Sequence, residues 1–321
     1  RLVPAACAAP LPSCSLQDLI VDRFEGREML GKGRHRRRMA TPFGEEGRVG
    51  DQAVEKGAQL LRTFGIEVAA AGPAPDPAVL LSAAKAASGG AAWDGMRTQH
   101  STVKLSAANL QGTVQRWSDI ASGQSLLRYS IGPLTGAAGF DGKTVWTQDG
   151  ADAAKPETTP AALELAANAA FRDRLAFWYP DRGRARIAYK ERAEADGRKF
   201  DVVSIVPEGG RAFEFWISVD TRLIERLVER EAEVTRTEIY SDRRDVQGVK
   251  IPFHVRTTRG DPKFDEVVEV QKIAFNEPLT DVAFGPPAQV PEFTFPAGRA
   301  SVDVDFEVFS GHAFVRVMLD G

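Results

Sequence analysis

Short segments of alternating apolar and polar residues recur along residues 98–276, and the tight turns between them constrain the fold most strongly. The dipeptides Asp141-Gly142 and Asp196-Gly197 lie between such segments, and they accept the positive φ angles that two-residue hairpin loops require. The links between strands are too short for the crossovers that parallel strands need. The sequence therefore predicts one large, strongly curved antiparallel sheet, in which strands adjacent in sequence are neighbours in space.

Two segments change to a helical period. Asp76 is a candidate cap for a helix over residues 76–90. A second helix is predicted over residues 158–180, with Thr159 as its cap and Pro180 as its stop, and its apolar residues lie three or four positions apart. The predicted fold class is mainly β with two helices (α+β), and the helices lie on the concave side of the curved antiparallel sheet.

The sequence also predicts how the chain is divided. Residues 1–75 read as a leader or a disordered segment, because basic and Ala/Pro-rich runs dominate them. The sheet domain is expected over residues 76–287. A Pro-containing linker follows over 288–300, and two new alternating strands make a hairpin within 301–321.

The overall composition excludes several functions. A net charge of −3 gives no general attraction to nucleic acid, and no apolar run is long enough to span a bilayer. The two cysteines, Cys7 and Cys14, both lie in the predicted leader. The lack of cysteine in the remaining sequence is compatible with a periplasmic location.

The sequence contains no recognisable catalytic constellation. Its histidines lack the spacing of metal ligands, and it has no P-loop, nucleophile elbow or dinucleotide-binding glycine pattern. Asp220 and Thr221 begin like an aspartic protease motif, but Arg222 replaces the glycine, so we interpret them as turn residues. We predict no catalytic residue, no metal ligand and no cofactor.

Large apolar side chains gather on the elements that should enclose the concave side. The candidate ligand-contacting residues come from the second helix and from one face of a strand: Phe171, Leu175, Trp178, Phe213, Phe215 and Ile217. The second helix also contains Phe177, which is not among the candidates. These side chains could line a hydrophobic cavity. A packed core would show the same pattern and is the commoner arrangement, because every sheet needs an apolar face. The sequence leaves both interpretations open.

Two segments carry a resemblance to a known family. "EFWISVDTRLIERLVE" (214–229) and "YSDRRDVQGVKIPFHV" (240–255) resemble the hairpin-and-strand signature of LolA/LolB-like proteins, which are periplasmic carriers of lipoproteins and other lipidated or apolar cargo. The second segment matches closely from Tyr240 to Phe253, whereas in the first Ile224 replaces the usual proline. The resemblance implies an unclosed β-barrel over helices, a periplasmic or secreted location, and a lipid, a lipoprotein or an apolar peptide as partner.

A second resemblance covers more of the chain. Residues 83–100 and 132–149, together with the carrier-like domain, are similar to the N-terminal region of bacterial retropepsin-like aspartyl proteases, in which a LolA-like domain precedes the protease domain. Residues 301–321 resemble the opening hairpin of that protease domain, before its Asp-Thr/Ser-Gly motif. The resemblance therefore implies a non-catalytic front domain that binds an apolar ligand. The alternative is a stand-alone LolA/LolB-like carrier of lipoproteins or lipids.

Overall fold

The computed structural model describes residues 74–150, 153–231, 234–288, 305–309 and 312–315. Nearly all of the predicted leader and linker lies outside these residues. The chain divides between Pro286 and Pro287 into two compact units. In the second unit, β14 (Phe306–Phe309) and β15 (His312–Val315) pair as an antiparallel hairpin.

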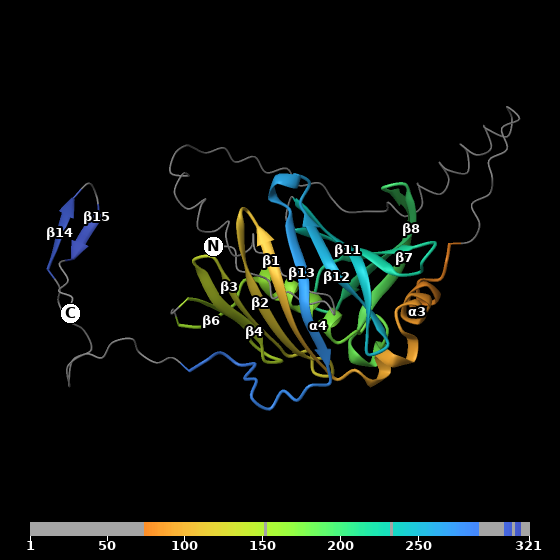
Figure 1. Cartoon of the computed structure of the whole chain (residues 1–321), viewed down its shortest axis with the longest axis horizontal. Coiled ribbons are helices and arrows are strands. Elements are labelled where there is room, and N and C mark those ends of the chain that lie inside the picture. The colour runs from red at the N-terminus through yellow and green to blue at the C-terminus, as the bar shows by residue number, and fades with distance from the viewer. Residues whose placement is uncertain (1–73, 151–152, 232–233, 289–304, 310–311, 316–321) are drawn as a thin grey trace, which may run out of the picture. The chain divides into compact units, whose positions relative to one another are not determined.

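Thirteen strands of the described residues form one antiparallel sheet in the first unit, which confirms the predicted fold class (Figure 1). The strands are β1 (Thr98–Ala107), β2 (Leu110–Asp119), β3 (Ser125–Ile131), β4 (Leu134–Phe140), β5 (Val145–Asp149), β6 (Lys155–Pro156), β7 (Ala185–Ala195), β8 (Arg198–Pro207), β9 (Phe213–Ser218), β10 (Ile224–Glu231), β11 (Val234–Val246), β12 (Val249–Thr258) and β13 (Glu266–Phe275). They lie in the order β6-β5-β4-β3-β2-β1-β13-β12-β11-β10-β9-β8-β7.

One pairing departs from the simple order that the sequence predicts. The first strand, β1, pairs with the last, β13, in the middle of the sheet, and Val103 lies opposite Val270. A register shift follows Thr102 in β1. The strand segments on either side of this pair follow the sequence order, so the edges of the sheet are β6 and β7, which are joined by the segment that contains the second helix.

Asp141-Gly142 does not form the predicted two-residue turn: four residues join β4 to β5, and only Gly142 has a positive φ angle, of 97°. Two other turns have the backbone geometry that their sequences favour. Asp196 and Gly197 have φ angles of 50° and 69°, and Gln247 and Gly248 have 52° and 85°. Two successive positive φ angles are the requirement of a type I′ turn, whose twist matches that of the flanking strands. These dipeptides therefore fix the registers of the β7–β8 and β11–β12 hairpins.

Both main helices begin as predicted. Helix α3 (Pro77–Ala87) is capped by Asp76, whose Oδ1 accepts a hydrogen bond of 2.8 Å from the backbone N–H of Ala78. Helix α4 (Pro160–Asp173) is capped by Thr159. Short 3-10 helices occupy Gly90–Gly95 (η2), Pro180–Arg182 (η3) and Pro262–Phe264 (η4). No helix of the described chain combines the length and the apolar character that a membrane span requires.

The end of α4 differs from the prediction, because the helix stops seven residues before Pro180. The backbone N–H of Ala176 donates to the carbonyl of Phe171 at 3.0 Å, and that of Leu175 donates to the carbonyl of Arg172 at 2.9 Å. This is the Schellman arrangement, and Leu175 occupies its left-handed position with a φ of 53°. Glycine usually fills that position, so sequence preferences did not reveal it.

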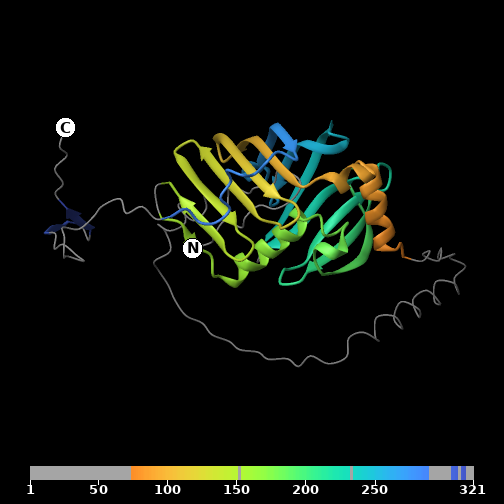
Figure 2. The same ribbon diagram turned by 90° about the horizontal axis from the view of Figure 1, so that it is seen from below.

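The interior lies on the concave side of the sheet (Figures 1 and 2). Helix α4 crosses this side, because Asp173 pairs with Arg116 of β2 and Asn168 bonds to Glu229 of β10. Helix α3 lies at one end of the sheet, coloured orange in both views. One hydrophobic cluster of buried residues joins both helices to the strands.

Candidate functional site: an apolar cavity on the concave side

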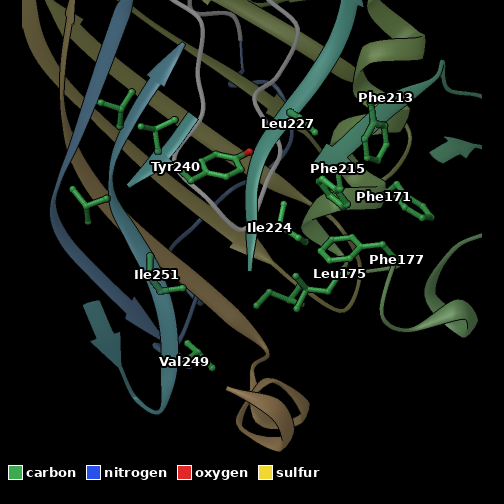
Figure 3. Close-up of a cluster of buried hydrophobic side chains, with 14 of the residues drawn as sticks. Phe171, Leu175, Phe177, Phe213, Phe215, Ile224, Leu227, Tyr240, Val249 and Ile251 are labelled. Carbon is green, nitrogen blue, oxygen red and sulfur yellow. The ribbon is translucent and has the colours of Figure 1, made fainter. Parts of the chain in front are cut away.

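The structure places the six predicted site residues in or against one apolar cluster. Phe171, Leu175, Phe213, Phe215 and Ile217 are each at most 5% exposed, and Trp178 is half-buried beside them. Aromatic rings meet edge to face, with centroids 5.2 Å apart for Phe213 and Phe215. Figure 3 shows Phe171, Leu175, Phe213 and Phe215 within this cluster.

A small cavity opens next to the cluster. It has a volume of about 40 Å³ and is lined by Ala84, Ser88, Trp93, Arg172, Phe177, Trp178, Phe215, Ile224, Tyr240, Arg243 and Lys250. Of the predicted residues, Trp178 and Phe215 are in this lining, whereas the other four pack in the core. The prediction did not include Trp93, Tyr240 or Arg243. Trp93 belongs to η2, and Tyr240 and Arg243 belong to β11. Neither residue spacing nor periodicity in the sequence indicates that these two elements meet next to Ile224 of β10.

The volume of this cavity shows whether the concave side is a packed core or holds space for a ligand. An apolar cavity of about 150 Å³ is needed to hold benzene, whereas this cavity offers about 40 Å³. The concave side is therefore packed in the described conformation. An acyl chain would need the walls of the cavity to separate.

One wall of the cavity is formed by α3 and η2. The indole N–H of Trp93 donates to Ser88 Oγ at 3.0 Å, and the backbone N–H of Lys250 donates to the carbonyl of Ser88 at 2.8 Å. The rings of Trp93 and Trp178 lie with their centroids 5.3 Å apart. The two tryptophans thus bring the α3 side of the cavity against the turn that follows α4.

Three polar side chains connect the same two walls, and we call Lys85, Asp94 and Tyr179 the latch. Asp94 is exposed, whereas Lys85 and Tyr179 are half-buried. Lys85 Nζ and the hydroxyl of Tyr179 each donate to Asp94 Oδ1 at 2.6 Å. These two hydrogen bonds hold the pKa of Asp94 below its usual value. The ammonium group of Lys85 also lies 4.3 Å from the centre of the Tyr179 ring. Because the Asp94 carboxylate at the centre of the latch is exposed, water and salt weaken these contacts.

Polar groups occupy the opposite side of the cavity. The hydroxyl of Tyr240 donates to Glu238 Oε2 at 2.8 Å, and burial raises the pKa of Tyr240 well above its usual value. Arg243 donates to the carbonyl of Ile224, and burial lowers the pKa of this arginine. An apolar cavity with cationic groups at its margin suits an amphiphile better than a plain hydrocarbon.

The two histidines of the sheet each have a polar neighbour at Nδ1, whereas Nε2 of His100 is buried without a partner among the described residues. His100 Nδ1 is 3.0 Å from Glu277 Oε2, and its ring stacks on Trp117 with centroids 4.9 Å apart. His254 Nδ1 is 3.0 Å from Ser241 Oγ. Across the residues that the structure describes, no group of three or more His, Cys, Asp or Glu side chains is arranged to hold a metal ion.

No protein-family model matches the chain, and no curated protein does so. Among solved structures it is similar to a LolA superfamily protein from Nitrosomonas europaea, with 11% identity and a TM-score of 0.45 over 64% of this chain and 95% of that one. A DUF1329 family protein from Desulfovibrio piger has 10% identity and a TM-score of 0.45, over 65% and 95% of the two chains. A putative outer membrane lipoprotein-sorting protein domain from Vibrio parahaemolyticus has 9% identity and a TM-score of 0.44, over 62% and 92%. At such identities and TM-scores, the function has to be argued from the residues of this chain.

Proposed function

We propose that the first unit is a non-catalytic, carrier-type domain that binds an apolar chain, such as the acyl group of a lipid or lipoprotein or an apolar peptide segment. The convergence of five aromatic side chains on the cavity carries this proposal: Trp93, Phe177, Trp178, Phe215 and Tyr240. The LolA/LolB-like signature of the sequence supports the same class of cargo. We place the protein in the periplasm or outside the cell, where carriers of that kind act.

The walls of the cavity have to part for such a ligand to enter. The latch consists of one ion pair and one hydrogen bond near the surface, where such contacts contribute little to stability. Burying an apolar chain contributes about 0.8 kcal/mol for each CH₂ group. A few methylene groups are therefore enough to offset the opening of the latch, although the apolar contacts of α3 through Leu80, Leu81 and Ala84 add to the cost.

Quenching of tryptophan fluorescence by a brominated fatty acid tests this proposal. Bromine quenches only at short range, and Trp93 and Trp178 line the cavity whereas Trp216 is not among its lining residues. Titrating the full chain should give saturable quenching. The double variant Trp93→Phe/Trp178→Phe should lose most of that quenching, because its remaining tryptophans lie elsewhere.

Trp216→Phe is the matched control, since it removes a half-buried tryptophan of β9 from outside the cavity. It should leave the saturable quenching in place. The proposal is wrong if the full chain shows no saturable quenching, or if Trp216→Phe removes as much of it as the double variant does.

The protease-linked interpretation is a narrower version of the same proposal. Phe306, Val308 and Phe314 are exposed on the β14–β15 hairpin. Strands of a further domain would cover such side chains. The coding sequence after residue 321 tests the idea: an Asp-Thr-Gly or Asp-Ser-Gly motif is expected shortly afterwards, and a continuation without one removes it.

A further inference from the structure

A second cavity of the first unit has a different chemical character. Its volume is about 340 Å³, and it is lined by Met96, Arg97, Ala121, Arg174, Asp181 and Arg182. Small-molecule pockets start at about 300 Å³, so this cavity has room for a compact ligand. The three arginines come from three places in the fold: just before β1, at the cap of α4 and at the end of η3.

The three guanidinium groups use few of their donors. Arg97 Nη1 donates to the carbonyls of Asp94 at 2.8 Å and Met96 at 3.3 Å, and Arg182 Nη1 donates to the carbonyl of Arg174 at 3.3 Å. Among the residues that the structure describes, none of the three forms an ion pair within 4.0 Å of a carboxylate, although Asp181 also lines the pocket. Several N–H groups therefore remain available to an acceptor.

Arg174 has a buried donor that no described residue pairs with. Its Nε is buried and has no hydrogen-bond partner, and a buried donor without an acceptor is unfavourable. Its aliphatic stem is held against the backbone of Gly123, where an added Cβ would lie 2.9 Å from both Cγ and Cδ. The side chain therefore cannot swing away easily to find another partner.

The negative end of the α4 dipole would attract a cation at Arg174 whatever the pocket binds. That effect does not account for Arg97 and Arg182, which reach the same cavity from other elements. Guanidinium groups match the oxygens of phosphate in pairs, and a phosphate monoester carries a charge of about −1.5 to −2 at pH 7. The pocket lining holds three positive guanidinium groups and one negative carboxylate, that of Asp181. Its net positive charge therefore suits the negative charge of a phosphate group.

We propose that Arg97, Arg174 and Arg182 form a binding site for a phosphate oxyanion, carried by a small phosphate ester or by a lipid headgroup. This site is separate from the apolar cavity, because the two share no lining residue. The proposal goes beyond the binding of an apolar chain and does not depend on it.

Titration of the full chain with inorganic phosphate at low salt, followed by ³¹P NMR or calorimetry, tests the site. Saturable binding is expected, and losing one charged hydrogen-bonding group should weaken it about tenfold or more. Arg174→Met keeps the stem that packs on Gly123 and removes the charge. Arg182→Gln is the second variant, and its affinity for phosphate tests the proposal if Arg174→Met does not fold. Arg244→Gln is the matched control, because Arg244 is exposed on β11 and paired with Asp242.

Vesicles distinguish the two sources of the phosphate. A lipid headgroup is identified by two results together. The chain sediments with phosphatidylcholine vesicles that contain phosphatidic acid but not with vesicles that lack it, and Arg174→Met and Arg182→Gln lose this binding. Binding of inorganic phosphate without vesicle binding identifies a soluble ester. The proposal is overturned if neither ligand binds, or if binding survives in both arginine variants. Quenching by the brominated fatty acid should be unchanged in Arg174→Met, so failure of one proposal is separable from failure of the other; Arg182 is not used for that comparison, because its guanidinium group lies 3.8 Å from the centre of the Tyr179 ring of the latch.

Discussion

Leu175 combines complete burial with a backbone conformation that disfavours its side chain. It is 0% exposed and has a φ of 53°. Leu175→Ala should lower the free energy of unfolding by about 3–5 kcal/mol, the usual cost of truncating a fully buried leucine. The further change from Ala to Gly should act in the opposite direction at this position.

The sign of that second step follows from the left-handed backbone. Removing the Cβ there relieves about 1–2 kcal/mol, whereas the added freedom of the unfolded chain costs about 0.4–1 kcal/mol. Leu175→Gly should therefore be more stable than Leu175→Ala by about 0.5–1 kcal/mol. Ala176 is the control: it is 2% exposed and has no positive φ, so Ala176→Gly should be less stable than the wild type by about 0.5–1 kcal/mol.

Guanidinium unfolding of the full chain, followed by tryptophan fluorescence, measures all four proteins. The opposite signs of the Ala-to-Gly step at neighbouring buried positions are the critical result. If Leu175→Gly is less stable than Leu175→Ala, then the chain does not make the left-handed turn that carries Phe177 and Trp178 to the cavity.

Three further predictions concern the sheet and its interior. Gly112→Ala should cost about 2–3 kcal/mol in thermal or urea unfolding, because the new Cβ would lie 2.1 Å from the carbonyl oxygen of Ser130; a neutral substitution would contradict the close approach of β2 and β3. Leu227→Ala, at a residue 1% exposed, should cost about 2–5 kcal/mol in the same assay, and a cost below 1 kcal/mol would mean that the site is not core. Burial raises the pKa of Asp173 to about 6 from an unperturbed 3.8, although Arg116 opposes the shift. The folded chain then holds this proton more tightly, so its contribution, up to about 3 kcal/mol, is complete below pH 4 and is lost as the pH rises through 6. Asp173→Asn should flatten that part of the stability profile, and an unchanged profile would refute the raised pKa.

Local sequence signals predicted much of the fold. Asp196-Gly197 and Gln247-Gly248 determine their own turn geometry, and Asp76 and Thr159 cap their helices within three residues in sequence. Each of these features depends on near neighbours, which a sequence pattern records directly. The pairing of β1 with β13 was not predicted, because no turn joins these strands and only closure of the whole sheet brings them together.

The candidate site was predicted only in part for the same reason. Alternation placed Phe213, Phe215 and Ile217 on one face, but whether a face encloses a cavity depends on the packing of α3 and of the turn at Leu175. The arginine pocket was not predicted, since Arg97 and Arg174 are 77 positions apart in sequence. Arginines that lie before a strand, at a helix cap and in a 3-10 helix share no periodicity that would single them out.

The central pairing of β1 with β13 has a consequence for how the protein is made. A ribosome releases β1 more than 150 residues before β13, and until then both β1 and β12 present open hydrogen-bonding edges. Such long-range closure slows folding, and exposed edges invite association with other chains. One edge strand of the finished sheet, β6, contains Pro156 and is a poor template for further pairing, whereas the other edge, β7, stays open. Nascent chains that stop before β13 should therefore associate with other chains more readily than chains that include it.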